Sequence, residues 1–149
     1  MPLKKGDSAP EITAKNQRGE TVSLSFETPT VLYFYPKDDT PGCTVEARQF
    51  NLELETYRDA GVDVYGVSMD DIDSHKDFAE KYDLGFDLLA DPNGEIARKF
   101  KVDTSQGRTE RTTFVLDDRE VKATYTGVKP DGHAREVLSD MIDEGLATL

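Results

Sequence analysis

The chain has 149 residues, a single cysteine and a formal net charge of −12. This length is typical of one domain with its own core, so we expect a single domain over residues 1–149. The acidic charge disfavours nucleic acid and anionic membranes as partners, because both attract basic surfaces. One cysteine excludes an intramolecular disulfide. The sequence shows neither a signal peptide nor the roughly 18 apolar residues of a membrane helix, so we expect a cytoplasmic protein.

The first part of the chain predicts a hairpin, a buried strand and a helix. Residues 12–24 alternate in polarity around a polar turn, which is typical of a β-hairpin. Residues 30–35, TVLYFY, form a continuous apolar run and predict a strand covered on both faces. From Cys43 to about Asp59, apolar residues recur at helical spacing, and Gly61 is a plausible stop.

The rest of the chain alternates between strands and helices. We expect strands at 62–68, 86–91, 112–117 and 121–127, and helices at 74–84, 95–100 and 133–146. This alternation predicts an α/β fold, with a mixed central sheet, helices on both faces and the N-terminal hairpin. Such folds place reactive groups on loops that follow the carboxyl ends of strands, and the loop 36–43 is one of these.

The turn Thr40-Pro41-Gly42-Cys43 places the only thiol at the start of the predicted helix. Thr40 is a good N-cap residue and proline is favoured at N1, which makes Cys43 the N3 residue. Unpaired N–H groups and the partial positive charge at this end stabilise a thiolate. Gly42 allows another group to approach the backbone closely, and Pro36 can shield one wall. The Thr40 hydroxyl, one turn from the sulfur, can hydrogen-bond to it or to a bound oxygen.

Several roles for Cys43 are open. A lone cysteine is often a small buried hydrophobe, whereas the helix start favours an exposed, reactive thiolate. A hydrolase needs a general-base histidine, but we expect His75 and His133 to be solvated or helix-start residues. The cysteine and histidines lack the spacing of a zinc site, so we expect no metal. An exposed thiolate without a base suits attack on a peroxide, which gives a sulfenic acid.

The segment YFYPKDDTPGCTVEA resembles the active-site segment of the peroxiredoxins, in particular the branch called bacterioferritin comigratory protein or peroxiredoxin Q. Pro36, Thr40 and Cys43 match the family signature Pro-x-x-x-Thr/Ser-x-x-Cys. The resemblance continues through GDSAPEIT, GVSMDDIDSHKDFAEKYDL, LLADPNGEIARKF, RTTFVLD and GVKPDGHAREVL. It implies a thioredoxin-like fold and a thiol-dependent peroxidase that reduces hydrogen peroxide and organic hydroperoxides without a cofactor.

The resemblance also implies a role for each site residue. Cys43 would attack the O–O bond, Thr40 would hydrogen-bond the peroxide, and Pro36 would limit solvent access. Arg111 would hold the thiolate and polarise the departing oxygen, which suits a planar cation with several donors. Glu46 would orient this arginine. From the residues alone, Arg111 could equally be a surface cation, and Glu46 a carboxylate that interacts with the helix dipole.

The sequence departs from many relatives, because no second cysteine is present to resolve the sulfenic acid. Arg48 stands where many relatives carry that cysteine, and we expect it to be solvated; the segment 74–84 has no cysteine either. Recycling would then need thioredoxin, glutaredoxin, a small thiol or a second subunit, with the protein a monomer or weak homodimer. A peroxide-sensing switch acting on a partner protein is the alternative. An inactive binding module is disfavoured by the intact motif.

Overall fold

A computed structural model describes residues 1–149 and contains one seven-stranded sheet with the strand order β2-β1-β5-β4-β3-β6-β7. The strands are β1 (Ile12–Lys15), β2 (Thr21–Leu24), β3 (Thr30–Phe34), β4 (Asp63–Ser68), β5 (Asp87–Ala90), β6 (Thr112–Asp117) and β7 (Glu120–Tyr125). The helices are α1 (Pro41–Asp59), α2 (Ile72–Tyr82), α3 (Glu95–Lys99) and α4 (His133–Asp143). The predicted elements are therefore present in the predicted order.

Strand β3 lies in the interior of the sheet, and all five of its residues are buried. It pairs in parallel with β4 and antiparallel with β6, so the sheet is mixed, as predicted. The register with β6 pairs Phe34 with Thr112. Residues just after β3 and just before β6 therefore meet at one edge of the sheet, although they are far apart in sequence.

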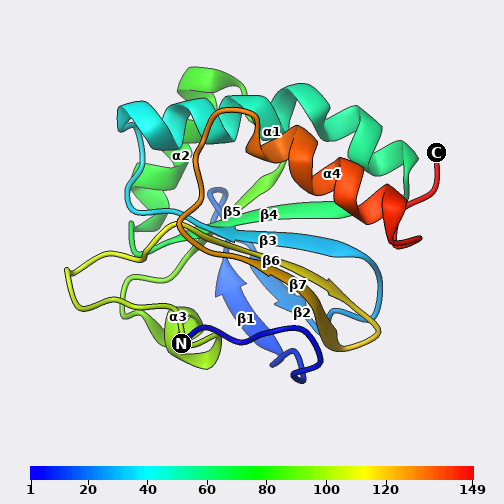
Figure 1. Cartoon of the computed structure of the whole chain (residues 1–149). Helices are drawn as coiled ribbons and strands as arrows, with labels where there is room; N and C mark the ends of the chain where they lie inside the picture. The colour runs from blue at the N-terminus through cyan, green and yellow to red at the C-terminus, as the bar shows by residue number, and fades with distance from the viewer.

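The two faces of the sheet are covered differently. Val31, Tyr33 and Tyr35 point to one face, where they share a hydrophobic cluster with α1, α2 and α4. Leu32 and Phe34 point to the other face, where α3 and the N-terminal segment cover them. Figure 1 shows α1, α2 and α4 on one side of the sheet and α3 on the other. The predicted helices on both faces are confirmed, with the short α3 alone on the second face.

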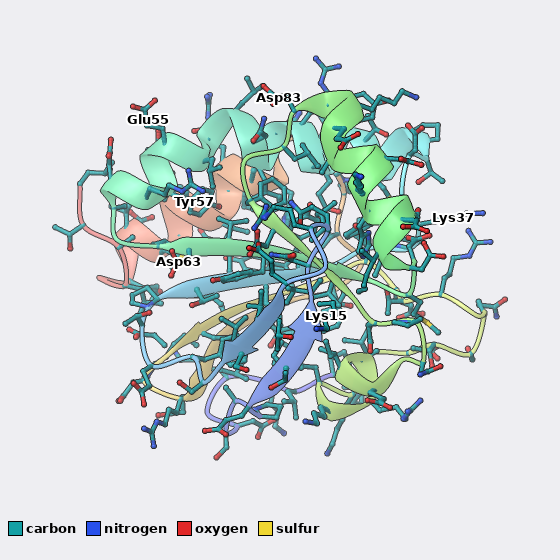
Figure 2. The ribbon with its side chains drawn as sticks, turned by 180° about the vertical axis from the view of Figure 1, so that it is seen from behind. Lys15, Lys37, Glu55, Tyr57, Asp63 and Asp83 are labelled. Carbon is teal, nitrogen blue, oxygen red and sulfur yellow. The ribbon has the colours of Figure 1, made fainter.

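Helix α1 lies across the sheet with an apolar stripe toward it. The predicted inward residues Ala47, Phe50, Leu54 and Tyr57 are all buried. The Tyr57 hydroxyl donates to the backbone oxygen of Ala134 in α4, and Figure 2 shows Tyr57 between these two helices. Burial of this stripe fixes α1 on the sheet, and with it the position of its first turn.

Helix boundaries differ slightly from the prediction. Helix α2 begins at Ile72, before the predicted segment 74–84, because the Asp71 side chain caps it by accepting from the Ser74 N–H. Helix α1 ends at Asp59, and Gly61 follows in the left-handed region with φ of 80°. None of the helices combines the length and the apolar character that crossing a membrane requires.

Candidate active site

The first turn of α1 carries Cys43 at N3, as the sequence predicts. Thr40 is the N-cap residue, with extended backbone, and Pro41 opens the helix. The expectation of an exposed thiol is wrong, because Cys43 is only 1% exposed. It lies four and seven residues before Ala47 and Phe50, on the same helix face, so the packing of α1 against the sheet buries it as well. Cys43 is nevertheless not surrounded by hydrocarbon alone.

Arg111 joins the sulfur to a buried carboxylate. It immediately precedes β6, at the sheet edge where β3 ends and α1 begins. Its Nη2 lies 3.5 Å from Cys43 Sγ and donates to it, while Nη1 donates to Glu46 Oε1 at 2.7 Å. The guanidinium thus bridges two residues of the first turns of α1, and its fork of donors makes this possible.

Gly42 leaves room for the guanidinium. A Cβ placed on Gly42 would lie 3.0 Å from Arg111 Nη2 and 3.4 Å from Pro130 Cγ. The first distance is shorter than ordinary contact, so a larger residue would require the guanidinium beside the sulfur to shift by a few tenths of an ångström. Arg111 is thus the group that lies close to Gly42.

Burial and charge contacts have opposite effects on the pKa values of Glu46 and Arg111. Burial raises the pKa of Glu46 to about 7, although its contact with Arg111 acts in the opposite direction. Burial also disfavours the charge on Arg111, but Glu46 and then Cys43 outweigh this effect and raise the pKa of the arginine. Arg111 therefore keeps its positive charge beside the sulfur, where it stabilises an anion.

Thr40 and Pro36 lie on the loop that leads into α1. The Thr40 hydroxyl donates to the Lys37 carbonyl at 2.9 Å, so in this conformation its proton points back into the loop. Its oxygen retains the capacity to accept, and rotation would release its proton for another acceptor. Pro36 is half-buried and lines a cleft with Arg108 and other residues of the loop before β6.

Of the two settings expected for the histidines, the helix start is observed and solvation is not. His75 and His133 do lie in the first turns of α2 and α4, but they are 0% and 3% exposed. His75 contacts Asp38, a residue of the active-site loop that the sequence did not single out. His133 Nε2 lies 2.8 Å from Thr113 Oγ1. Nothing in local spacing predicts these contacts, because each joins residues distant in the chain.

Asp38, Asp70 and His75 are the only three residues whose ligand atoms approach as a metal site would require, within 4.8 Å of one another. Hydrogen bonds within the protein already use these atoms: Asp38 accepts from Tyr35 and Ser74, and Asp70 accepts from Ser68. The cluster is therefore satisfied without an ion. Cys43 and His133 are not part of it.

The sulfur, the helix end and the guanidinium together form a site for nucleophilic chemistry. Positive charge stabilises a thiolate before reaction and also stabilises negative charge that develops on a leaving oxygen. Neither histidine contacts Cys43, so no general base of the kind used by cysteine hydrolases is in place. The arrangement fits attack by sulfur on a weak bond with a good leaving group, such as O–O.

Comparison with known proteins identifies the class. The chain matches the AhpC/TSA family over residues 5–124 and therefore belongs to it. Among solved structures, peroxidoxin BcpB from Mycobacterium tuberculosis is 32% identical and superposes with a TM-score of 0.89, covering 95% of this chain and 97% of its own. A cysteine mutant of Xylella fastidiosa PrxQ gives a TM-score of 0.90 at 29% identity, over 97% and 99% of the two chains. The fold is thioredoxin-like, and the class is peroxiredoxin.

The relatives found by sequence comparison indicate the branch of the peroxiredoxin family. Putative peroxiredoxin bcp of Coxiella burnetii is 39% identical over 148 residues, which cover 93% of this chain and 98% of the relative. Chloroplastic peroxiredoxin Q of Triticum aestivum is 44% identical over 142 residues, which cover 91% of this chain but only 65% of that relative. The chain resembles the peroxiredoxin Q and bacterioferritin comigratory protein branch, as its motifs predict. The branch places it among the thiol-dependent peroxidases, which are oxidoreductases.

Proposed function

We propose that this chain reduces hydrogen peroxide and organic hydroperoxides through Cys43. The observation that carries the proposal is the 3.5 Å contact of Arg111 Nη2 with Cys43 Sγ at the start of α1. The thiolate attacks one peroxide oxygen, so that an S–O bond forms while the O–O bond breaks. The sulfur becomes a sulfenic acid, and the second oxygen leaves as hydroxide or alkoxide and takes a proton from solvent.

Each neighbouring residue has a part in this step. Arg111 stabilises the charge on the departing oxygen, and Glu46 holds Arg111 in position through the 2.7 Å hydrogen bond. Thr40 hydrogen-bonds the peroxide after its hydroxyl turns away from Lys37. Pro36 limits the access of water, and Gly42 leaves space for the guanidinium. Support for these roles comes from the family signature and from the contacts of Arg111.

Recycling follows a one-cysteine scheme, because the chain has no second thiol. An external thiol condenses with the sulfenic acid to give a mixed disulfide and water. A second thiol attacks that disulfide, releases Cys43 and leaves as the oxidised disulfide of the reductant. The reductant is thioredoxin, glutaredoxin or a small thiol, since all three supply these electrons in the same form.

Location and assembly belong to the proposal too. The bacterial bcp relative supports the cytoplasm, and relatives named as chloroplastic make an organelle the alternative. We infer a monomer or weak homodimer; light scattering after size exclusion over a range of concentrations tests this, and a concentration-independent dimer would contradict it.

Stopped-flow peroxide reduction tests the function directly. Wild-type protein should consume hydrogen peroxide and cumene hydroperoxide, and Cys43→Ser should consume neither. Mass spectrometry of the wild type after one equivalent of peroxide should find oxygen on Cys43. A panel of thiol donors then separates enzyme from switch: steady turnover supports the peroxidase, whereas fast oxidation that no donor reverses would indicate the peroxide sensor. Activity in Cys43→Ser would reject the mechanism.

A further inference from the structure

The loop between β3 and α1 contains a buried acid that the proposed chemistry does not use. The Asp38 side chain is 3% exposed. Its Oδ1 accepts from the Tyr35 hydroxyl at 2.6 Å, and its Oδ2 accepts from the Ser74 hydroxyl at 2.8 Å. The same Oδ2 lies 2.7 Å from His75 Nδ1. A carboxylate with this many close partners is held in one place.

His75 meets Asp38 from α2, and its hydrogen bonds fix where the protons lie. Its other ring nitrogen, Nε2, lies 3.1 Å from the Leu89 carbonyl oxygen in β5. A carbonyl only accepts, so Nε2 carries a hydrogen. Nδ1 and Asp38 Oδ2 would repel each other as two lone pairs at 2.7 Å, so one proton lies between them. The pair is therefore neutral overall, which explains how both groups tolerate complete burial.

These contacts hold the loop against α2 and β5. The Asp38 N–H also donates to Asp70, just after β4. The next residue, Asp39, adopts left-handed backbone with φ of 56° and pairs with Lys81 near the end of α2 at 2.8 Å. Consecutive loop residues thus contact the two ends of one helix. Figure 2 shows Lys37, the preceding residue, beside α2.

The contacts of Asp38 with His75 and its other partners, which we call the clamp, act on the proposed peroxide site through the loop backbone. Thr40 donates its hydroxyl proton to the carbonyl of Lys37, the residue directly before Asp38. Thr40 is also the N-cap of α1, and its carbonyl accepts from the Thr44 N–H at 2.8 Å. A shift of Asp38 would therefore displace both the hydroxyl of Thr40 and the turn that holds Cys43.

We propose that Asp38 and His75 are positioning residues, which clamp the 36–40 loop so that Thr40 and Cys43 are ready to receive a peroxide. The inference rests on the proposed function. It has a second consequence, because Cys43 is 1% exposed: an external thiol, which is bulkier than hydrogen peroxide, needs the first turn of α1 and the loop before it to move before it can reach the sulfur. The clamp favours oxidation of Cys43 and opposes its reduction by an outside thiol.

The proposal predicts opposite changes in the rates of the two half-reactions, which a simple loss of stability would not produce. Oxidation by hydrogen peroxide and reduction of the oxidised protein by dithiothreitol are measured separately. In Asp38→Ala, oxidation should slow roughly 10- to 100-fold, the scale expected when a reacting group is misplaced by about 1 Å. Reduction should become several-fold faster. Tyr35→Phe, which keeps the ring and removes one hydrogen bond, should shift both rates in the same directions by less.

Asp38→Asn keeps the shape of the side chain and its hydrogen bonds but removes the carboxyl group. Its amide oxygen can accept from Tyr35, and its NH2 can donate to a neutral His75, so we expect both half-reactions within about threefold of wild type. Asp91→Ala is the matched control: Asp91 is 4% exposed and accepts from the N–H groups of Ile96 and Ala97 in α3, away from the loop. This control should lower stability without changing the rates of oxidation and reduction in opposite directions.

Proton NMR tests the clamp independently of activity. The shared proton should give a far-downfield resonance in wild type that disappears in His75→Gln. Rates in Asp38→Ala that match wild type, or that change together in the same direction, would overturn the proposal; if that variant does not fold, unchanged rates in Tyr35→Phe would do so. A wild type that shows the resonance but leaves peroxide intact would instead reject the proposed function.

Discussion

At the residue scale, Arg111 serves two acceptors with two different nitrogens. One nitrogen donates to the Cys43 sulfur and the other to Glu46, and the side chain is only 17% exposed. A charge held this way needs little rearrangement when negative charge develops on a peroxide oxygen. In the proposed mechanism, the contribution of Arg111 therefore depends on the planar fork as well as on the charge.

We predict that Arg111→Lys slows oxidation of Cys43 by roughly 10²- to 10³-fold, the cost of losing a preorganised donor. The ammonium keeps the charge, but it is a single compact donor group that cannot reproduce the fork across Cys43 and Glu46. Stopped-flow oxidation measures the effect. Arg108→Lys is the control, since Arg108 is exposed and three residues earlier, and its rate should match wild type. A wild-type rate for Arg111→Lys would remove the fork from the mechanism.

The burial of Glu46, the carboxylate that Arg111 contacts, makes the stability of the protein depend on pH. It is 0% exposed, and its Oε2 has no hydrogen-bond partner. Its pKa in the folded protein, about 7, lies above the ordinary value of 4.5. The folded state therefore holds the proton of Glu46 more tightly than the unfolded state does, and this contribution to stability is complete below about pH 4.5 and lost as pH rises to about 7.

We predict that Glu46→Gln removes this loss. In a Cys43→Ser background, where no thiol titrates, the two proteins should differ little in stability at the acidic end of the range. The glutamate protein should then lose stability relative to the glutamine protein as the pH rises toward 8, because ionised Glu46 is poorly solvated. Urea unfolding at a series of pH values measures the difference. Parallel curves across the range would show that Glu46 does not titrate there.

At the element scale, the first turn of α1 combines good helix signals with a residue that helices disfavour. Pro41 suits the N1 position, and Thr40 is the N-cap residue although its side chain makes no capping hydrogen bond, whereas glycine in a helix is unfavourable relative to alanine by up to about 1 kcal/mol. Arg111 occupies the space that Gly42 leaves, which explains why a glycine is found here despite its unfavourable effect on the helix. Local helix stability and the geometry of the site are in conflict at this position.

We predict that Gly42→Ala keeps or slightly raises the free energy of unfolding while it slows oxidation of Cys43. The new methyl group, 3.0 Å from Nη2, must displace the guanidinium. Stability comes from denaturant unfolding and oxidation from stopped flow. If the effect passes through Arg111, the double variant with Arg111→Lys should be little slower than Arg111→Lys alone. Full additivity would contradict this explanation.

Most elements could be predicted from the sequence because their signals are local. The aromatic run of β3, the apolar stripe of α1 and the Thr-Pro start of that helix each lie within one segment. The start of α2 was placed too late, because the capping Asp71 lies outside the apolar pattern. The spacing of Cys43 with Ala47 and Phe50 places it on the apolar face of α1, but whether the sheet covers the first turn of that face depends on how α1 lies on the sheet.

At the scale of the whole molecule, the formal charge of −12 is spread over 149 residues. Like charges in a compact chain repel one another, and dissolved salt screens that repulsion. We predict that the urea midpoint rises as sodium chloride increases from about 0.05 M to about 0.5 M. Potassium chloride should give the same curve, because the effect is screening. A midpoint that falls with salt would mean that attractive ion pairs dominate.

The sequence by itself determined the order of the elements and the place of Cys43 at N3 of its helix, and the family motifs supplied the site residues that we propose. These depend on local spacing and on short segments. Only the tertiary structure decided that Arg111 reaches the sulfur, that Cys43 is buried and that Asp38 meets His75. Each of these facts joins residues more than 30 positions apart or depends on how a helix packs, and the register of β3 with β6 and the packing of α1 and α2 set those distances.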